Sequence, residues 1–357
     1  MPPPVPPSAA RLTGRARDAF AAWFGAVEPE GGSLGGAGFS GCWIGRVRPL
    51  GGGQWFVLKS FVPDASRERA AWVHGFVRHL AGCGVAEVPV ARETSRGETV
   101  VTDAGGIHWE LVPFVEGVVT DAPSVPQAAA ALMALARVHV AAATLPGHSP
   151  VRGPSPGMLR RRAQAAELIA RPWGSRVVRT VTDASAAVLA RRDLACDVVE
   201  SPAGRSALRI LAAWPVEHVP LQVVLRDIWS DHVIYAADFG ERVAGIVDVH
   251  ASGVDTPAAD IARLAGSWRS VHGSRTADPA LAWARALTAY ESVRPLEPTE
   301  RRLVASLHAA GVLCGLDNWF RWTLEEGRTF PNPAAVLSRI DRLLADMPAA
   351  VERLSGS

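Results

Sequence analysis

Lysine is almost absent from this 357-residue sequence, and so are the marks of several common protein classes. The four cysteines lie far apart without a CxxC pair, which argues against a disulfide framework and against a clustered zinc site. No apolar run approaches the length of a membrane span, and no cleavable signal segment opens the chain. We therefore expect a soluble, cytoplasmic protein that has reduced cysteines and does not bind membranes.

The formal net charge is only +2, too small to predict nucleic acid as a partner. Arginine supplies every side-chain cation except Lys59, which stands in the apolar stretch QWFVLKSFV. A compact ammonium suits a phosphate oxygen or a single carboxylate, whereas arginine presents a planar fork. Lys59 is therefore a candidate functional residue, and a lysine that reaches solvent from an edge strand is the alternative.

The length and the hydrophobic content of 48% suffice for one large domain or for two lobes. Proline-rich residues 1–14 predict a disordered tail. Strand-like segments separated by glycines fill much of residues 15–115, and the composition then changes to that of a loop. Helical spacing dominates residues 116–357, so we place the boundary between two lobes after residue 115.

Two aspartates end apolar strands in the stretch LQVVLRDIWSDHVIYAADFGERVAGIVDVH. Asp227 opens a polar turn after a buried strand, and Asp248 closes a strand after the next two turns. An unpaired carboxylate is costly to bury. Two of them at strand ends therefore predict a cation, a metal ion or a proton for them to handle.

Two features earlier in the chain could serve a phosphate. The glycine-dense residues 31–41 can point N–H groups at anionic oxygens, with Gly36, Gly38 and Ser40 as candidates, although glycine-rich hairpins are common. Glu68 lies four residues before Trp72 on the predicted helix 66–81, so it continues the apolar stripe inward. This position suggests an ion pair with the lysine, and a solvated acid in the first helical turn is the alternative.

A cluster of arginines and a pair of tryptophans in the second half of the chain can each be interpreted in two ways. Arginine far outnumbers acidic residues between positions 151 and 214, where Arg160, Arg161 and Arg162 are consecutive. Such a cluster is typical of a solvated helix face, but arginines that line a substrate cleft disfavour a polycationic substrate. Trp319 and Trp322 have helical spacing, which favours the core over a platform for stacking on a ligand.

The order of these features along the chain resembles that of the aminoglycoside phosphotransferase and choline kinase-like family. The features are the glycine turn, the strand lysine, the helix glutamate, and the segments LRDIWSDHVIY and GIVDVHASGVDTPAADIARL. The resemblance covers about residues 34–264. It implies an α+β, two-lobed protein-kinase-like fold, with a small N-terminal lobe that carries an antiparallel sheet and a larger, mainly helical C-terminal lobe. It also implies a small-molecule kinase that transfers the gamma-phosphate of ATP or GTP to a substrate hydroxyl.

The resemblance assigns roles to individual residues. Asp227 matches the catalytic aspartate that accepts the proton of the attacking hydroxyl, and Asp248 matches the aspartate that binds Mg²⁺. Lys59 resembles the lysine that contacts the nucleotide phosphates. Residues 110–115 resemble the hinge that holds adenine by backbone hydrogen bonds, with Glu110 and Val112 as the contacting residues.

The catalytic motif departs from the family pattern at three positions. Leu225 and Arg226 stand where the family has histidine and glycine, and His232 replaces a metal-binding asparagine. Asparagine offers a hard oxygen that suits Mg²⁺, whereas neutral imidazole is a softer nitrogen ligand preferred by ions such as Mn²⁺ and Zn²⁺. His232 could thus be a metal ligand, Asp231 could replace it, or the second metal site could be lost. The alternative function is a catalytically impaired nucleotide-binding protein with a regulatory role. Asp260 resembles the family aspartate that braces the catalytic loop.

Overall fold

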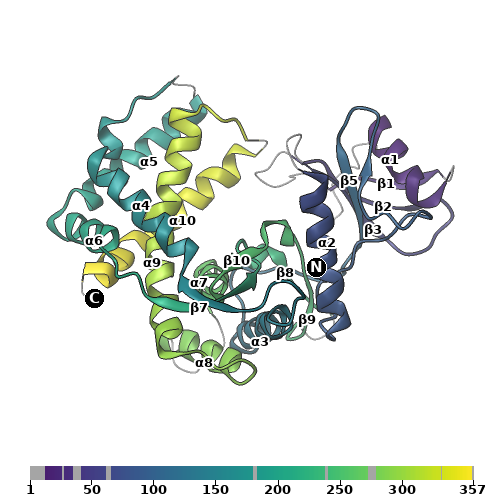
Figure 1. Cartoon of the computed structure of the whole chain (residues 1–357). Helices are drawn as coiled ribbons and strands as arrows, with labels where there is room; N and C mark the ends of the chain where they lie inside the picture. Colours follow the sequence, from purple (N-terminus) through teal and green to yellow (C-terminus); the bar gives the residue numbers. More distant parts are fainter. Residues whose placement is uncertain are drawn as a thin grey trace. The chain divides into compact units, whose positions relative to one another are not determined.

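The computed structural model describes residues 13–25, 28–34, 42–61, 66–179, 183–237, 240–271, 279–330 and 332–355. The chain divides into two compact units (Figure 1), of which the first joins Met1–Val118 to Ile234–His250 and the second joins Val119–Val233 to Ala251–Ser357. The predicted division into residues 15–115 and 116–357 therefore needs a correction. The segment Ile234–His250 belongs with the first unit, because Tyr235 forms an antiparallel bridge with Val118.

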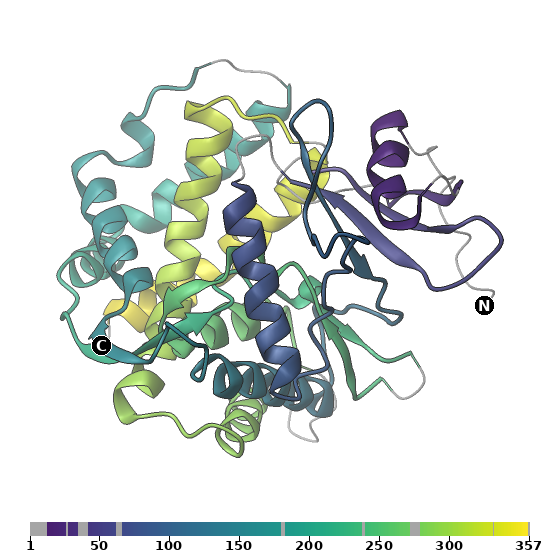
Figure 2. The same cartoon turned by 45° about the vertical axis from the view of Figure 1, so that its right-hand side comes forward.

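The first unit is built on a five-stranded antiparallel sheet in the order β1-β2-β3-β5-β4. Its strands are β1 (Pro29–Ser33), β2 (Ile44–Pro49), β3 (Phe56–Ser60), β4 (Val101–Thr102) and β5 (His108–Pro113). Two helices cover opposite faces of this sheet (Figure 2), α1 (Gly14–Phe24) and α2 (Arg67–Gly82). A separate two-stranded sheet pairs β8 (Val233–Tyr235) with β9 (Val243–Ile246).

The alternation of side chains along β3 decides which way the lysine points. Phe56 and Leu58 are buried on the face of the sheet that packs against α1. Lys59 therefore points to the other face, which α2 covers. Glu110 lies directly opposite Lys59 in the register of β3 and β5, so both side chains share that face. Ser66 accepts a hydrogen bond from the Arg69 amide and so caps the start of α2.

The second unit is mainly helical around a three-stranded antiparallel sheet in the order β10-β7-β6. Its strands are β6 (Val151–Pro154), β7 (His218–Val224) and β10 (Gly253–Asp255). Its α-helices are α3 (Val125–Ala142), α4 (Pro156–Ala170), α5 (Asp183–Val199), α6 (Pro202–Ala212), α7 (Pro257–Gly266), α8 (Pro279–Glu291), α9 (Pro298–Phe320) and α10 (Pro333–Ser355). Short helical turns are η1 (Trp173–Ser175), η2 (Ser230–His232), η3 (Val249–Ala251), whose last residue alone belongs to this unit, and η4 (Arg321–Glu325).

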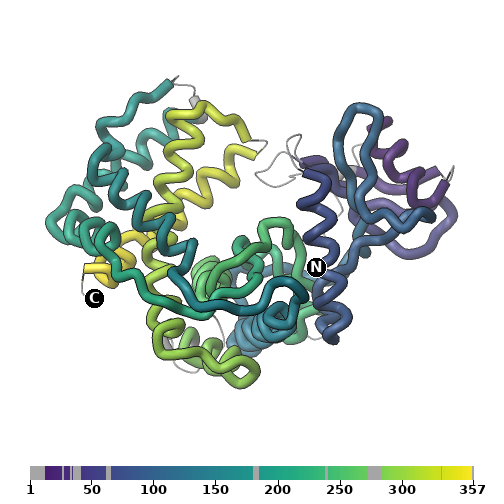
Figure 3. The backbone as a smooth tube through the Cα atoms, viewed as in Figure 1, coloured from purple at the N-terminus to yellow at the C-terminus, as the bar shows by residue number. Residues whose placement is uncertain are grey.

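Helix α9 runs directly into η4, which is a π-helical turn, before the chain folds back as α10 (Figure 3). Helices α9 and α10 pack against each other along this return. Trp319 is only 7% exposed, and its ring meets Trp322 edge-on with 5.2 Å between the ring centroids. The prediction that both tryptophans belong to the core is confirmed for Trp319, whereas Trp322 is only half-buried.

Two helical segments, Val125–Ala142 and Pro298–Glu325, are long and apolar enough to cross a membrane by length and composition alone. Our expectation that no segment reaches that length is therefore too strict. In the structure, 56% and 72% of their apolar windows are buried inside the protein. Such burial is what a helix in the core of a folded protein shows, because its apolar surface already has a protein partner.

Candidate active site

The first part of the candidate site is an ion pair in the first unit. The Lys59 ammonium donates to Asp248 Oδ1 over 2.5 Å, with the two side chains 13% and 49% exposed. Asp248 follows β9 and has the left-handed φ of 58°. Burial alone would lower the pKa of Lys59, but the carboxylates of Asp248 and Glu110 outweigh it and raise that pKa above its usual value. An edge-strand lysine in solvent is excluded, because β3 lies between β2 and β5.

The predicted ion pair between Lys59 and Glu68 is wrong. Glu68 is exposed in the first turn of α2, where its carboxylate accepts a 2.5 Å hydrogen bond from the Ser66 hydroxyl. That hydrogen bond lowers the pKa of Glu68. The buried side of α2 is formed instead by residues that include Val73 and His74. The alternative of a solvated acid near the helix N-terminus is therefore the correct one.

The buried position on α2 belongs to His74, which joins a cluster around Glu110. The Glu110 carboxylate, 4% exposed, lies 2.7 Å from Nε2 of His74 and 2.7 Å from Nε2 of His250. Nδ1 of His74 bonds the Thr99 hydroxyl over 2.8 Å. Burial would raise the pKa of Glu110, but His250, His74 and Lys59 together lower it below its usual range.

The same three side chains could hold a metal ion, since a nitrogen of each histidine and a Glu110 oxygen all lie within 4.8 Å of one another. Two imidazoles and a carboxylate are a ligand set that suits zinc. In the structure the carboxylate instead bonds both rings. The cluster thereby ties α2, β5 and the segment that follows Asp248 to one buried acid.

The structure also corrects the predicted adenine contacts at Glu110 and Val112. Both residues lie inside β5, opposite Lys59 and Val57 of β3. In an antiparallel pair of strands, opposite residues alternate between hydrogen-bonded and non-hydrogen-bonded pairs. The Phe61 amide donates to the His108 carbonyl, so these two residues form a bonded pair. Two and four residues along β3, the pairs Lys59–Glu110 and Val57–Val112 are therefore bonded as well. Their backbone groups thus serve the sheet and are not available to adenine.

The prediction that the glycine-rich segment binds phosphate concerns three residues. Gly36, Gly38 and Ser40 lie outside the described residues. In the sequence they stand between β1 and β2, and β2 pairs with β3, the strand that carries Lys59. Phosphate binding by these three residues stays a prediction.

The second part of the candidate site is the loop after β7 in the second unit. Asp260, fully buried in the first turn of α7, accepts hydrogen bonds of 2.6 Å from the backbone amides of Leu225 and Arg226. Its Oδ2 also lies 3.1 Å from Nε2 of His139, whose Nδ1 bonds the Tyr290 hydroxyl over 2.7 Å. Arg226 has a left-handed φ of 66°. These contacts are those expected of an aspartate that braces the loop.

Asp227 follows directly and keeps its carboxylate half exposed. Its Oδ1 accepts a 2.8 Å hydrogen bond from the Trp229 indole and lies 3.3 Å from Nη2 of Arg263. The Arg263 guanidinium also stacks on the Trp229 ring, 4.7 Å from its centroid. Nδ1 of His232 lies 3.0 Å from the Asp227 carbonyl oxygen and can only donate to it. In neutral His232 this leaves the lone pair on Nε2, the nitrogen that could bind a metal ion.

Sequence analysis missed four residues of these two clusters: His74, His250, Trp229 and Arg263. The spacing of Ala70, Val73, His74 and Val77 places His74 on the buried side of α2, so this signal was present. Arg263 lies one helical turn after Asp260 on α7, but nothing in the sequence shows that it reaches Asp227.

Comparison with known proteins gives one family and several relatives. A family model described as "Phosphotransferase enzyme family" matches residues 37–296. The homoserine kinase of Brucella anthropi is 28% identical over 254 residues, which are 69% of this chain and 66% of that protein. The homoserine kinase of Methylobacterium nodulans is 28% identical over 259 residues, 71% of this chain and 68% of that protein. The match thus spans about two thirds of the length of these relatives.

Solved structures show the same fold at low sequence identity. A spectinomycin phosphotransferase in complex with ADP and spectinomycin matches with a TM-score of 0.65 and 8% identity, covering 96% of this chain and 99% of that one. A microcompartment-associated aminopropanol kinase has a TM-score of 0.59 and 13% identity, covering 95% and 98%. These similarities confirm the predicted α+β, protein-kinase-like fold.

Proposed function

The chain belongs to the phosphotransferase enzyme family, and we propose that it transfers the gamma-phosphate of ATP or GTP to a hydroxyl of a small molecule. One observation carries most of this proposal: the only lysine of the sequence, in the middle of a sheet, is paired with an aspartate 189 residues later. Phosphoryl transfer requires neutralised phosphate charge and an aligned nucleophile, with little covalent help from the protein. Lys59, Asp248 and Asp227 are suited to these tasks.

The residues of the first unit fit a nucleotide and a divalent ion. Lys59 keeps its charge at neutral pH and would bind phosphate oxygens, and the half-exposed carboxylate of Asp248 would bind Mg²⁺ or Mn²⁺. When bound, the ion neutralises part of the phosphate charge. In the second unit, His232 would offer a nitrogen ligand to a divalent ion through Nε2.

Asp227 would accept the proton of the acceptor hydroxyl. Its contacts with the Trp229 indole and with Arg263 both go to Oδ1. Oδ2 is then the oxygen that can receive a proton while Oδ1 fixes the orientation of the carboxylate. The bracing by Asp260 keeps the backbone before Asp227 in one conformation.

The names of the relatives suggest acceptors for a first screen. We propose homoserine, aminopropanol and spectinomycin as the starting compounds, followed by a wider set of hydroxyl metabolites. We further propose that the protein acts in the cytoplasm on such free small molecules and has no nucleic acid partner.

The test combines nucleotide binding with turnover. Thermal shifts are measured with ATP and GTP in Mg²⁺ and in Mn²⁺, and ADP or GDP release is measured across the acceptor set. We expect Asp227→Asn to keep the nucleotide-induced shift and to lose about 100-fold or more in release. Asp193→Asn, an exposed acid on α5, is the control and should behave as the wild type.

Two outcomes contradict the proposal. The absence of a nucleotide-induced shift with either ion would refute nucleotide binding itself. Binding without release for the whole acceptor set would support the alternative, a catalytically impaired nucleotide-binding protein.

The choice of metal ion tests His232 separately. If Nε2 of His232 is a ligand, His232→Asn should supply a hard oxygen instead and lower the ratio of activity in Mn²⁺ to activity in Mg²⁺. An unchanged ratio in His232→Asn together with a changed ratio in Asp231→Asn would assign the ligand to Asp231.

A further inference from the structure

Five arginines line one pocket of the second unit. The pocket has a volume of about 450 Å³, and its walls come from α4, α7, α9, η4 and the loop before Asp227. The arginines are Arg160, Arg161, Arg226, Arg263 and Arg321, which we call the arginine pocket. This volume is in the range that holds a small molecule.

The arginine pocket borders the proposed proton acceptor. Arg226 directly precedes Asp227 in the chain. Arg263 lines the pocket, and its Nη2 lies 3.3 Å from Asp227 Oδ1. A molecule bound among the arginines would therefore lie next to the residue that we propose activates the hydroxyl.

The five arginines outnumber the acidic side chains around them. Asp255 and Glu167 belong to the lining, and two acids outside it pair with lining arginines: Asp227 lies 3.3 Å from Arg263 and Glu326 lies 3.4 Å from Arg321. Asp255 is buried and accepts hydrogen bonds from the Ser155 hydroxyl (2.7 Å) and from the Gly157 amide (2.8 Å). Glu167 lies 3.7 Å from Arg171, a residue outside the lining. Asp255 also lies 3.6 Å from Nη2 of Arg160. Within the described part of the chain, Arg161 and Arg226 are therefore the two lining arginines that have no carboxylate partner.

Arg161 shows the imbalance most clearly. Its Nε is buried and has no hydrogen-bond partner, and its Nη1 donates only to the carbonyl of Gly157, over 3.1 Å. Burial lowers the pKa of this guanidinium. A desolvated cation without a carboxylate partner is unfavourable, and an anionic ligand would relieve it.

Glycines leave room for the guanidinium groups at two places. A Cβ atom at Gly253 would lie 2.7 Å from Nη1 of Arg226, and one at Gly157 would lie 3.0 Å from Nη1 of Arg161. Both contacts are too short for a larger residue to be accommodated without a shift of the arginine. A Cβ at Gly157 would first meet Asp255 Oδ2, at 2.8 Å, so Gly253 is the position of the two where a guanidinium group is the nearest neighbour.

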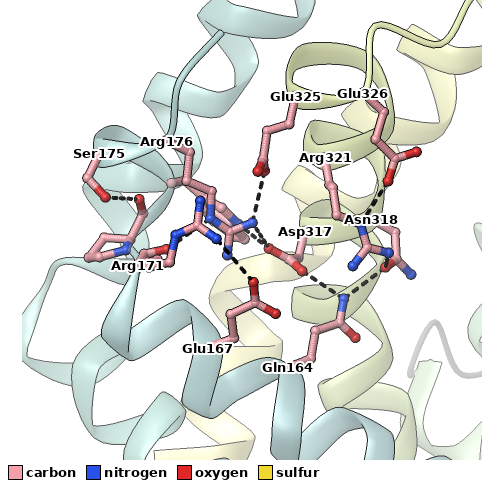
Figure 4. A network of polar contacts seen from close by, with 12 residues as sticks. Gln164, Glu167, Arg171, Ser175, Arg176, Asp317, Asn318, Arg321, Glu325 and Glu326 are labelled. Atoms are coloured by element: carbon pink, nitrogen blue, oxygen red, sulfur yellow. Dashed lines mark hydrogen bonds and ion pairs between the residues drawn. The ribbon is translucent and has the colours of Figure 1, made fainter. Parts of the chain in front are cut away.

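Figure 4 shows how the wall between α4 and α9 is fixed. The Gln164 amide donates to Asp317 and to Asn318, over 2.8 Å each, and Arg176 donates to Asp317 over 2.8 Å. Asn318 in turn accepts from Nη2 of Arg321 over 3.2 Å. This network holds Arg321 at the start of the π-helical turn, where it lines the pocket.

We infer that the acceptor of this enzyme carries an oxyanion, a carboxylate or a phosphate, which the arginine pocket binds while the hydroxyl faces Asp227. Guanidinium groups bind both kinds of oxyanion through paired hydrogen bonds. The same charge disfavours polycationic amino sugars. The inference rests on the proposed function for its reaction, but the anion site itself can be measured without turnover.

The test uses four three-carbon compounds that share hydroxyl groups and differ in charge: glycerate, glycerol 3-phosphate, glycerol and 3-amino-1,2-propanediol. Their binding is measured by calorimetry and by thermal shift at constant ionic strength, without nucleotide. We expect glycerate or glycerol 3-phosphate to bind at least about tenfold more tightly than the neutral and cationic compounds. Comparison of these two shows whether the site takes a carboxylate or a phosphate.

Variants assign the binding to the pocket. Arg160→Gln and Arg321→Gln change partly exposed side chains, 57% and 38% exposed, and should each weaken anion binding about tenfold. Arg162→Gln removes the same charge from the same helix outside the pocket lining and should leave anion binding unchanged. Arg161→Gln is less informative, because its burial could affect folding.

The outcomes separate this inference from the proposed function. Equal binding of all four compounds overturns the inference, as does an equal loss in Arg162→Gln and the two pocket variants. If either result accompanies ADP release from a neutral or cationic acceptor, the kinase function stands and the anion site does not. If anions bind selectively but no acceptor is phosphorylated, the anion site stands and the kinase function fails.

Discussion

Asp260→Asn is the sharpest perturbation of the catalytic loop, because it changes one atom of a fully buried side chain. In the wild type the carboxylate accepts from the amides of Leu225 and Arg226, each over 2.6 Å. The two amides bond different oxygens, Oδ2 and Oδ1, and asparagine has an oxygen at only one of these positions, so it keeps only one of the two bonds. Its NH₂ group would then face the other backbone N–H, donor against donor.

The structure sets the size of the effect. A hydrogen bond to a charged group contributes about 1.5–3 kcal/mol, and removing its acceptor while the donor stays buried costs a similar amount, which replaces this value and is not added to it. The local opening of the loop should thus become easier by about 2–3 kcal/mol. Since each 1.4 kcal/mol is a factor of ten, the amides of Leu225 and Arg226 should exchange with solvent about 30- to 150-fold faster.

Two measurements check this prediction. Hydrogen exchange of the two amides reports on the loop directly. Release of ADP should fall about 100-fold, because a small displacement of Asp227 misaligns the hydroxyl. Glu300→Gln is the matched control, since Glu300 is 1% exposed and bonds Arg294 and the Glu297 amide, each over 3.0 Å, at the start of α9.

Both variants should lower the free energy of unfolding, but only Asp260→Asn should change exchange at the loop. Unchanged protection of Leu225 and Arg226 in Asp260→Asn would refute the bracing role. Equal loss of protection in both variants would show that global stability, and not the loop, controls exchange.

Two further predictions concern pH. The pKa of Lys59 is raised above its usual 10.5. The ion pair with Asp248 should therefore stabilise the fold fully below pH 10 and lose its effect as pH rises through the folded-state pKa. The Tm difference between wild type and Lys59→Met should shrink only above pH 10. The hydrogen bonds from Arg15 lower the pKa of Asp103 below its usual 3.8, so its contribution is present above that pH and lost as pH falls through the lower folded-state pKa. The Tm difference between wild type and Asp103→Asn should therefore be full at pH 6 and shrink below pH 4, and a pH-independent difference would contradict the assignment.

The main elements could be predicted because their apolar periods are strong. Alternating and continuous apolar residues predicted a strand at 221–225 and a helix at 66–81, which the structure has as β7 and α2. The two aspartates at strand ends were visible for the same reason: a carboxylate interrupts an apolar run. The return of Ile234–His250 to the first unit was not visible, since it depends on the bridge between Val118 and Tyr235, far apart in sequence.

The wrong partner for Lys59 has a geometric cause. The prediction included Trp72 in the buried stripe of α2, and Glu68 lies one turn before it. In the structure Trp72 is only half-buried, and the stripe is centred on residues that include Val73 and His74. A shift of one position rotates a helix by about 100°, which moves Glu68 from the sheet to solvent.

The role of Glu110 could not be read from the sequence because it depends on strand register. The residue shares a face with Lys59 only because β3 and β5 pair in the register that places the two opposite each other. A slip by one residue would turn Glu110 to the other face of the sheet. The apolar residues on both sides of it gave no signal for the histidines that it bonds.

The arginine at position 226 connects the backbone conformation of the catalytic loop with the charge of the pocket. The family motif has glycine here, and this chain has a side chain at φ 66°, a conformation that costs a non-glycine residue about 1–2 kcal/mol. Glycine itself costs about 0.5–1 kcal/mol through the entropy of the unfolded chain. Arg226→Gly should therefore leave stability unchanged or raise it by up to about 1.5 kcal/mol.

The same substitution should act in the opposite direction on binding. Arg226 lines the arginine pocket, so Arg226→Gly should weaken the binding of glycerate or glycerol 3-phosphate about tenfold while denaturant unfolding shows an equal or more stable fold. Arg226→Gln is the matched variant, since it removes the charge but keeps a side chain in the left-handed conformation, and it should lose affinity without gaining stability. Wild-type affinity in Arg226→Gly would show that the arginine serves the loop and not the ligand. If Arg226→Gly loses both stability and affinity while Arg226→Gln loses only affinity, the arginine side chain holds the loop together. The strained residue is retained for its charge only if Arg226→Gly binds more weakly and its stability is unchanged or higher.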